Sequence, residues 1–145
     1  MIKFNSVYKD YPRSGLALKN VSFHIRKGEF VFLTGHSGAG KSTVLKLIQM
    51  AETPSSGEVR VSGYSSTRIR RGEIPRLRRK LGVVFQDYRL LPDRSAAENV
   101  AFALEVTGTR RGAIGPRVGR LLAQVGLAAK ASSLPQELSG GERQR

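Results

Sequence analysis

The stretch Gly35-His36-Ser37-Gly38-Ala39-Gly40-Lys41-Ser42 constrains this chain more than any other part of its sequence. It fits the pattern G-x-x-x-x-G-K-[ST] at every fixed position. The preceding residues are apolar enough for a buried strand, and the following residues have the spacing of an amphipathic helix. Glycines in such a loop let backbone N–H groups point at phosphate oxygens, while the helix N-terminus adds a positive dipole end. The sequence therefore predicts a strand, a phosphate-binding loop and a helix in succession.

The residues of this loop have distinct predicted roles toward ATP and Mg²⁺. Lys41 is expected to place its ammonium group at the β- and γ-phosphates, and the Ser42 hydroxyl is expected to bind Mg²⁺. Thr43 adds a predicted contact on the α-phosphate side. The alternative, a chance glycine-rich turn before a helix, is disfavoured by the strand and helix patterns on either side. The predicted ATP-binding residues here are Gly35, His36, Ser37, Gly38, Ala39, Gly40, Lys41, Ser42 and Thr43.

Two kinds of strand pattern occur along the chain. Residues 2–8 and the alternating apolar residues of 21–25 are typical of half-buried antiparallel strands, so we expect an antiparallel edge there. Residues 29–34 form a near-continuous apolar run, as in a central strand covered on both faces of a parallel sheet. A short strand at 58–61 and another apolar strand at 82–85 are also predicted.

Helical spacing follows the loop and dominates the second half. The helix that begins at Lys41 is expected to stop before the turn cluster Thr53-Pro54-Ser55-Ser56-Gly57. A basic helix-like stretch is predicted at 72–80, and two further helices at 95–106 and 117–125. Together these patterns predict an α/β chain with an N-terminal antiparallel β edge, a partial parallel core sheet and a helical subdomain.

Composition limits the classes of function that the chain can have. Its 145 residues suit one domain or part of one, and without cysteine there is no disulfide framework or thiolate metal site. No apolar stretch approaches the roughly 20 residues of a membrane span, and no secretory signal pattern opens the chain, so we expect a cytoplasmic protein. The formal charge of +14 suggests nucleic acid or an anionic membrane surface as partner. However, the charge concentrates in 68–80 without interleaved aromatic residues, which favours a solvated helix face and no direct nucleic-acid contact.

The last eight residues, Leu138-Ser139-Gly140-Gly141-Glu142-Arg143-Gln144-Arg145, have the pattern of a helix start. Ser139 is a predicted N-cap, and Glu142 stands three positions later, as in a capping box. The two glycines leave the amides of the first turn uncovered. We therefore expect a second place where an anion can dock, in addition to a simple cap.

A phosphate loop followed by Leu-Ser-Gly-Gly-Glu resembles the ATP-binding-cassette (ABC) family of ATPases, and the resemblance covers the whole chain. It implies the ABC-type nucleotide-binding domain of the P-loop NTPase class. By the same resemblance, Tyr11 matches the adenine-stacking aromatic, and Gln86 matches the Q-loop glutamine that senses the γ-phosphate through Mg²⁺. Two cassettes of the family face each other head to tail. The resemblance therefore implies a homodimer in which the partner's ATP contacts the signature residues Ser139, Gly140, Gly141 and Glu142.

Within this family, three features resemble the FtsE-type cell-division ATPases. They are the histidine inside the loop, Val84-Phe85-Gln86-Asp87 and Glu98-Asn99-Val100-Ala101. That resemblance implies an FtsX-type membrane permease as partner. It also implies a peripheral position on the cytoplasmic face of the plasma membrane, at the division septum. Lipoprotein-release and macrolide-export cassettes share most of these motifs, and cassettes of the DNA-repair type are a further alternative. The latter carry long insertions, which are not seen in this sequence.

The resemblance also predicts what these residues do not supply. A complete cassette has an Asp that orients Mg²⁺, a Glu that activates water and a switch His, all after the signature helix, so the chain reads as truncated there, with no catalytic residue among the 145. We expect it to bind ATP but not to hydrolyse it appreciably, and to expose unpaired apolar edges of the sheet. The expected parts are an ATP-binding core at 1–86, a helical subdomain at 87–137 and the signature motif at 138–145.

Overall fold

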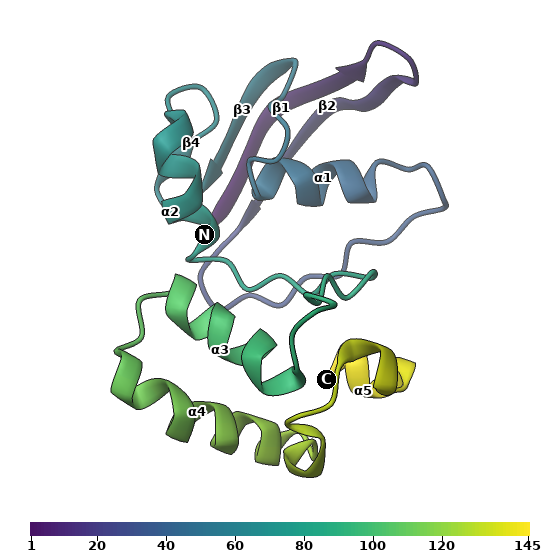
Figure 1. Ribbon diagram of the computed structural model, residues 1–145. Coiled ribbons are helices and arrows are strands. Elements are labelled where there is room, and N and C mark those ends of the chain that lie inside the picture. The colour runs from purple at the N-terminus through teal and green to yellow at the C-terminus, as the bar shows by residue number, and fades with distance from the viewer. The chain divides into compact units, whose positions relative to one another are not determined.

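A β-hairpin of β1 (Ile2–Tyr11) and β2 (Gly15–Ile25) begins the chain, and the computed structural model describes all 145 residues. β3 (Ser56–Val61) pairs with the other edge of β1, and the short β4 (Tyr64–Ser65) pairs with β3. The sheet has the order β2-β1-β3-β4 with every pair antiparallel, which confirms the predicted antiparallel edge (Figure 1).

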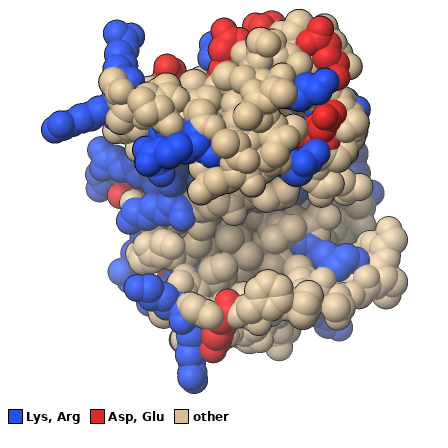
Figure 2. All heavy atoms as spheres, turned by 90° about the horizontal axis from the view of Figure 1, so that it is seen from below, with Lys and Arg blue, Asp and Glu red and all other residues tan.

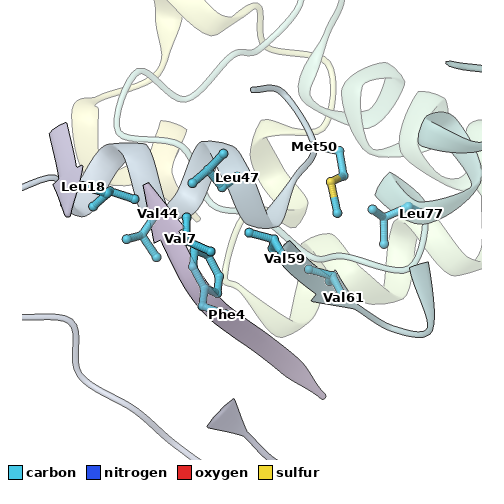
Figure 3. Close-up of a cluster of buried hydrophobic side chains, with 9 residues drawn as sticks. All are labelled: Phe4, Val7, Leu18, Val44, Leu47, Met50, Val59, Val61 and Leu77. Carbon is cyan, nitrogen blue, oxygen red and sulfur yellow. The ribbon is translucent and has the colours of Figure 1, made fainter. Parts of the chain in front are cut away.

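The helix after the phosphate loop, α1 (Lys41–Ile48), packs its apolar face on this sheet. Val44 and Leu47 of α1 are buried, whereas Leu45 of the same predicted pattern is exposed. Figure 3 shows the cluster that α1 shares with the strands, together with Met50 and a leucine of α2 (Ile74–Arg78). Its members are Phe4, Val7, Leu18, Val44, Leu47, Met50, Val59, Val61 and Leu77. Burial of these apolar side chains is the main force that fixes α1, and with it the loop at its N-terminus, against the sheet.

The two predicted parallel strands are not formed, and this part of the sequence prediction was wrong. Residues 29–34 and 82–85 are in neither strand nor helix. Phe30 and Phe32 are 83% and 79% exposed, and Val84 is 84% exposed. A strand that is covered on both faces needs neighbouring strands and covering layers, and these segments pair with no strand of the structure. The expected parallel sheet with unpaired edges is therefore absent, and its two segments are exposed without strand structure.

The chain divides into two compact units, Met1–Gly82 and Val83–Arg145, each with its own apolar cluster. The second unit is helical, with α3 (Ala96–Val106), α4 (Arg111–Gln124) and α5 (Gly140–Gln144). Leu104 of α3 packs with Ile114, Val118 and Leu122 of α4. Both helices predicted in this half are therefore present, and α4 begins six residues earlier, at Arg111 instead of Arg117.

The basic run at 68–80 folds as a short 3₁₀ turn, Arg71–Glu73, followed by α2. The Arg78 guanidinium donates to the carbonyl oxygens of Gln49 and Met50, at 3.1 and 3.2 Å, where α1 ends. Lys80 lies over the Tyr64 ring, 5.2 Å from its centroid. The other arginines of the run are solvent-exposed. Figure 2 shows the excess of Lys and Arg over Asp and Glu on one face of the molecule.

None of the helices has both the length and the apolar character that crossing a bilayer requires.

Candidate nucleotide-binding site

The phosphate loop lies at the N-terminus of α1, where the sequence predicts it. The cap residue Gly40 has a left-handed backbone, φ +84°, and no side chain caps the helix. The first amides of α1 are therefore not covered by a capping side chain and can serve an anion, which the helix dipole also favours. Residues 35–39 are solvent-exposed, so phosphate can reach the loop.

The Lys41 side chain folds back over the loop. Its ammonium group donates hydrogen bonds to the carbonyl oxygens of Gly35 and His36, both at 2.7 Å. The loop is also closed by the Ala39 N–H, which donates to the His36 oxygen at 3.2 Å. A cation is thus held at the loop by carbonyl groups, in position to bind phosphate oxygens.

Gly40 is in close contact with β2. A Cβ atom at this position would lie 2.7 Å from the Ala17 carbonyl oxygen and 2.7 Å from Leu18 Cδ2. Only glycine fits between the loop and the strand at this backbone angle. This contact places the start of α1 against β2 at the end of the hairpin, where Tyr11 of β1 pairs with Gly15.

Tyr11 is therefore in the same unit as the phosphate loop, at the last position of β1. Its ring is half-buried, and its hydroxyl group is buried without a hydrogen-bond partner. The Lys9 ammonium lies over the ring, 4.8 Å from the centroid. Sequence reasoning missed Lys9. The period of two in a strand places residues 9 and 11 on one face, which was the available signal.

Ser42 and Thr43 are the second and third residues of α1 and differ in exposure. Ser42 is exposed, and its hydroxyl oxygen is a suitable ligand for Mg²⁺, a hard cation that prefers oxygen and commonly shares it with substrate phosphates. Thr43 is only 9% exposed. A Mg²⁺ ion bound with nucleotide would thus find a protein ligand at Ser42. Its chemistry would be the neutralisation of phosphate charge.

Gln86 lies in the second unit, in a turn where the Tyr88 N–H donates to the Phe85 carbonyl oxygen at 3.2 Å. Its side chain is exposed. The signature residues belong to the same unit. Arg143 of α5 lies over the Tyr88 ring, 5.5 Å from its centroid, and a Cβ atom on Gly140 would be 3.5 Å from the Tyr88 hydroxyl oxygen. The segment after Gln86 therefore contacts the signature helix.

The capping box predicted at the start of α5 is confirmed. The Ser139 Oγ accepts from the Glu142 N–H at 3.2 Å, and a Glu142 carboxylate oxygen accepts from the Ser139 N–H at 2.8 Å. Hydrogen bonds from the Ser139 N–H, the larger cause, and from the Ser139 hydroxyl lower the pKa of the Glu142 carboxyl. An identical arrangement of Ser95 and Glu98 begins α3 and lowers the pKa of Glu98 in the same way. Residues 139–142 thus form an ordered helix start.

The structure accordingly groups the predicted site residues in two sets. Tyr11 and all residues of the phosphate loop lie in the first unit, whereas Gln86 and Ser139–Glu142 lie in the second. The acidic and histidine side chains nowhere form a group of three that could hold a metal ion. A bound Mg²⁺ ion would therefore take a single oxygen ligand from a side chain such as Ser42, together with oxygen atoms of the phosphates.

Comparisons with known proteins show which family the chain is similar to. The family profile described as ABC transporter matches residues 18–145. The cell division ATP-binding protein FtsE of Mycobacterium tuberculosis is 51% identical over 146 residues, with 100% of this chain and 64% of the relative covered. FtsE of Escherichia coli K12 is 50% identical over 145 residues, with 100% and 65% covered. The methionine import ATP-binding protein MetN of Helicobacter hepaticus is 43% identical, with 41% of its length covered.

Solved structures give the same result for the fold. The ATP-binding cassette MJ0796, in a dimeric post-hydrolysis state bound to ADP and Pi, superimposes with a TM-score of 0.88 at 34% sequence identity. The match covers 99% of this chain and 65% of the cassette. The chain thus spans a little under two thirds of the length of the cell-division relatives and of this cassette.

Proposed function

The chain belongs to the ABC transporter family, and we propose that it is the ATP-binding part of an FtsE-type cell-division ATPase. The subgroup rests on the relatives named FtsE, which are about 50% identical over the whole chain. The MetN relative is less similar, at 43%.

The observation that carries ATP binding is the position of Lys41. Its ammonium group lies 2.7 Å from two carbonyl oxygens of an exposed loop, at the N-terminus of a helix without a side-chain cap. Backbone amides, a helix dipole and a mobile cation are the elements by which such loops bind the β- and γ-phosphates. In this proposal Ser42 binds Mg²⁺, Thr43 supports the α-phosphate side and the Tyr11 ring stacks on adenine.

We further propose that the site is completed by a second copy. The Ser139–Glu142 helix start would meet the ATP held by the partner copy. The ATP-binding cassette MJ0796, a relative of known structure, is dimeric. Gln86 would respond to the γ-phosphate through Mg²⁺ and water. Because Tyr88 lies beside Gly140 and under the Arg143 guanidinium, a movement of the Gln86 turn would be passed to the signature helix.

The second unit would bind the FtsX-type membrane permease. A groove of about 620 Å³ in this unit is lined mainly by apolar side chains, among them Val84, Phe102 and Leu121. A cytoplasmic helix of the permease, with an apolar face, suits such a groove. The permease would hold the chain at the cytoplasmic face of the plasma membrane, at the division septum, where the whole protein would couple ATP hydrolysis to cell-wall remodelling.

ATP hydrolysis is proposed for the whole protein and not for these 145 residues. The aspartates present, Asp10, Asp87 and Asp93, lie in β1 and in turns, and none follows a strand beside the phosphate loop. Titration of Mg-ATP with simultaneous detection of released phosphate tests this assignment. We expect saturable ATP binding with phosphate release no faster than in buffer. Rapid turnover that is lost in Lys41→Ala would contradict this division of roles.

A further inference from the structure

We propose that Lys9 is a positioning residue of the nucleotide site: it fixes the Tyr11 ring for adenine and ties that ring to the helix of the phosphate loop. The inference rests on the proposed ATP-binding function. It adds Lys9 to the site. Through Lys9, the ring that stacks on the base would be connected to the helix that follows the phosphate loop.

The contacts of Lys9 are the first step. Its ammonium group lies 4.8 Å from the centroid of the Tyr11 ring, within the range of a cation–π interaction. The same nitrogen is 3.1 Å from a carboxylate oxygen of Glu52 and donates to the Thr53 carbonyl oxygen at 2.9 Å. The Lys9 side chain is only 12% exposed, so these interactions are partly shielded from water. One cation thus joins the ring to a segment distant in sequence.

That segment is the chain that leaves α1. Glu52 and Thr53 follow four and five residues after the last residue of α1, Ile48. Further hydrogen bonds fasten the same segment to the end of β1. The Ser55 N–H donates to the Tyr8 carbonyl oxygen at 2.9 Å, and the Asp10 N–H donates to Ser55 Oγ at 3.0 Å. The strand that carries Tyr11 is therefore held to the C-terminal side of α1, while the phosphate loop lies at its N-terminal side.

This linkage has a consequence for a ligand that spans both places. ATP can bind with its phosphates at Lys41 and its base at Tyr11 at the same time only if these two residues keep a fixed separation. Lys9 supports that separation through Glu52 and Thr53. In this proposal adenine would stack on the face of the Tyr11 ring opposite the Lys9 ammonium. A ring ordered before the ligand arrives loses less conformational entropy on binding, so ATP binds more tightly.

If Lys9 has this role, its removal should lower the binding affinity only for ligands that have a base. We expect Lys9→Met to weaken Mg-ATP binding about fivefold, the range of a partly shielded cation–π interaction. Binding of inorganic tripolyphosphate, which carries no base, should change less than about twofold, because Lys9 does not touch the phosphate loop. Lys9→Arg, which keeps a cation over the ring, should retain most of the ATP affinity.

The experiment is isothermal titration of the full chain with Mg-ATP and with Mg-tripolyphosphate. Lys3→Met is the matched control, because Lys3 is an exposed lysine of the same strand. The double variant Tyr11→Leu with Lys9→Met should bind ATP no more weakly than Tyr11→Leu alone, since Lys9 acts through the ring. Should Lys9→Met fail to fold by circular dichroism, Glu52→Gln gives the same test, with a smaller selective loss expected.

Three results would overturn the inference. These are an equal loss for ATP and tripolyphosphate, an unchanged ATP affinity in Lys9→Met, and a further loss in the Tyr11→Leu background. A wild-type chain that binds neither ligand would instead overturn the proposed ATP binding itself, so the two failures are distinguishable.

Discussion

At the scale of single residues, the phosphate loop is where sequence and structure agree best. Its pattern is local, since glycines, a lysine and a hydroxyl at fixed spacing are all that the loop requires. The contact between Gly40 and β2 is not local. It joins residue 40 to residues 17 and 18, and no pattern in the sequence predicts that contact. The contacts of Lys9 with Glu52 and Thr53 are likewise distant along the chain, although the strand period alone places Lys9 on the face of Tyr11.

Gly40→Ala tests this contact. The new Cβ would lie 2.7 Å from both the Ala17 oxygen and Leu18 Cδ2, at a backbone angle that alanine rarely adopts. We expect the free energy of unfolding to fall by more than the roughly 1–3 kcal/mol of backbone strain alone. Gly63→Ala is the control, because Gly63 has a similar φ of +88° and nothing within 4 Å of its Cβ position. Equal losses in urea unfolding would show that the contact with β2 is unimportant.

At the scale of elements, the helix start at Ser139 and the antiparallel strands could be predicted, whereas the start of α4 and the apolar strands could not. The cap at Ser139 and the alternation of Val21, Phe23 and Ile25 depend on neighbouring residues, and the structure confirms both. A buried parallel strand depends on partners that lie elsewhere in the chain. Residues 29–34 have the composition of such a strand, yet they pair with none of the strands of the structure.

The capping box of α3 gives a prediction with a definite pH dependence. Hydrogen bonds from the Ser95 N–H and hydroxyl lower the pKa of Glu98 in the folded state below its ordinary value of 4.5. The carboxylate therefore stabilises the folded chain fully above pH 4.5, and this contribution is lost as the pH falls through the folded pKa. The wild type should exceed Glu98→Gln in free energy of unfolding at pH 7, with the difference vanishing in stronger acid.

Urea unfolding over a pH series measures this difference. Glu105→Gln on the exposed side of the same helix is the control, and it should show no such trend. A difference between the wild type and Glu98→Gln that grows as the pH is lowered would have the wrong sign for a stabilising carboxylate.

At the scale of the whole molecule, the resemblance to the ABC family predicted the fold more completely than the local sequence patterns did. The structure matches an ATP-binding cassette at a TM-score of 0.88 over 99% of this chain, and that match covers 65% of the cassette. Phe30, Phe32 and Val84 have exposed side chains. They lie in segments that the sequence patterns correctly mark as apolar but incorrectly assign to buried strands. Motif recognition predicts the site, whereas tertiary pairing decides which strands form.

The most direct test of the account is titration of the full chain with Mg-ATP, comparing the wild type with Lys41→Ala. Loss of a charged hydrogen-bond donor at the phosphates should weaken binding about ten- to a hundredfold. Lys46→Ala, an exposed lysine on the same helix, should bind as the wild type does. An ATP affinity that is unchanged in Lys41→Ala would contradict the assignment of this loop as the nucleotide site.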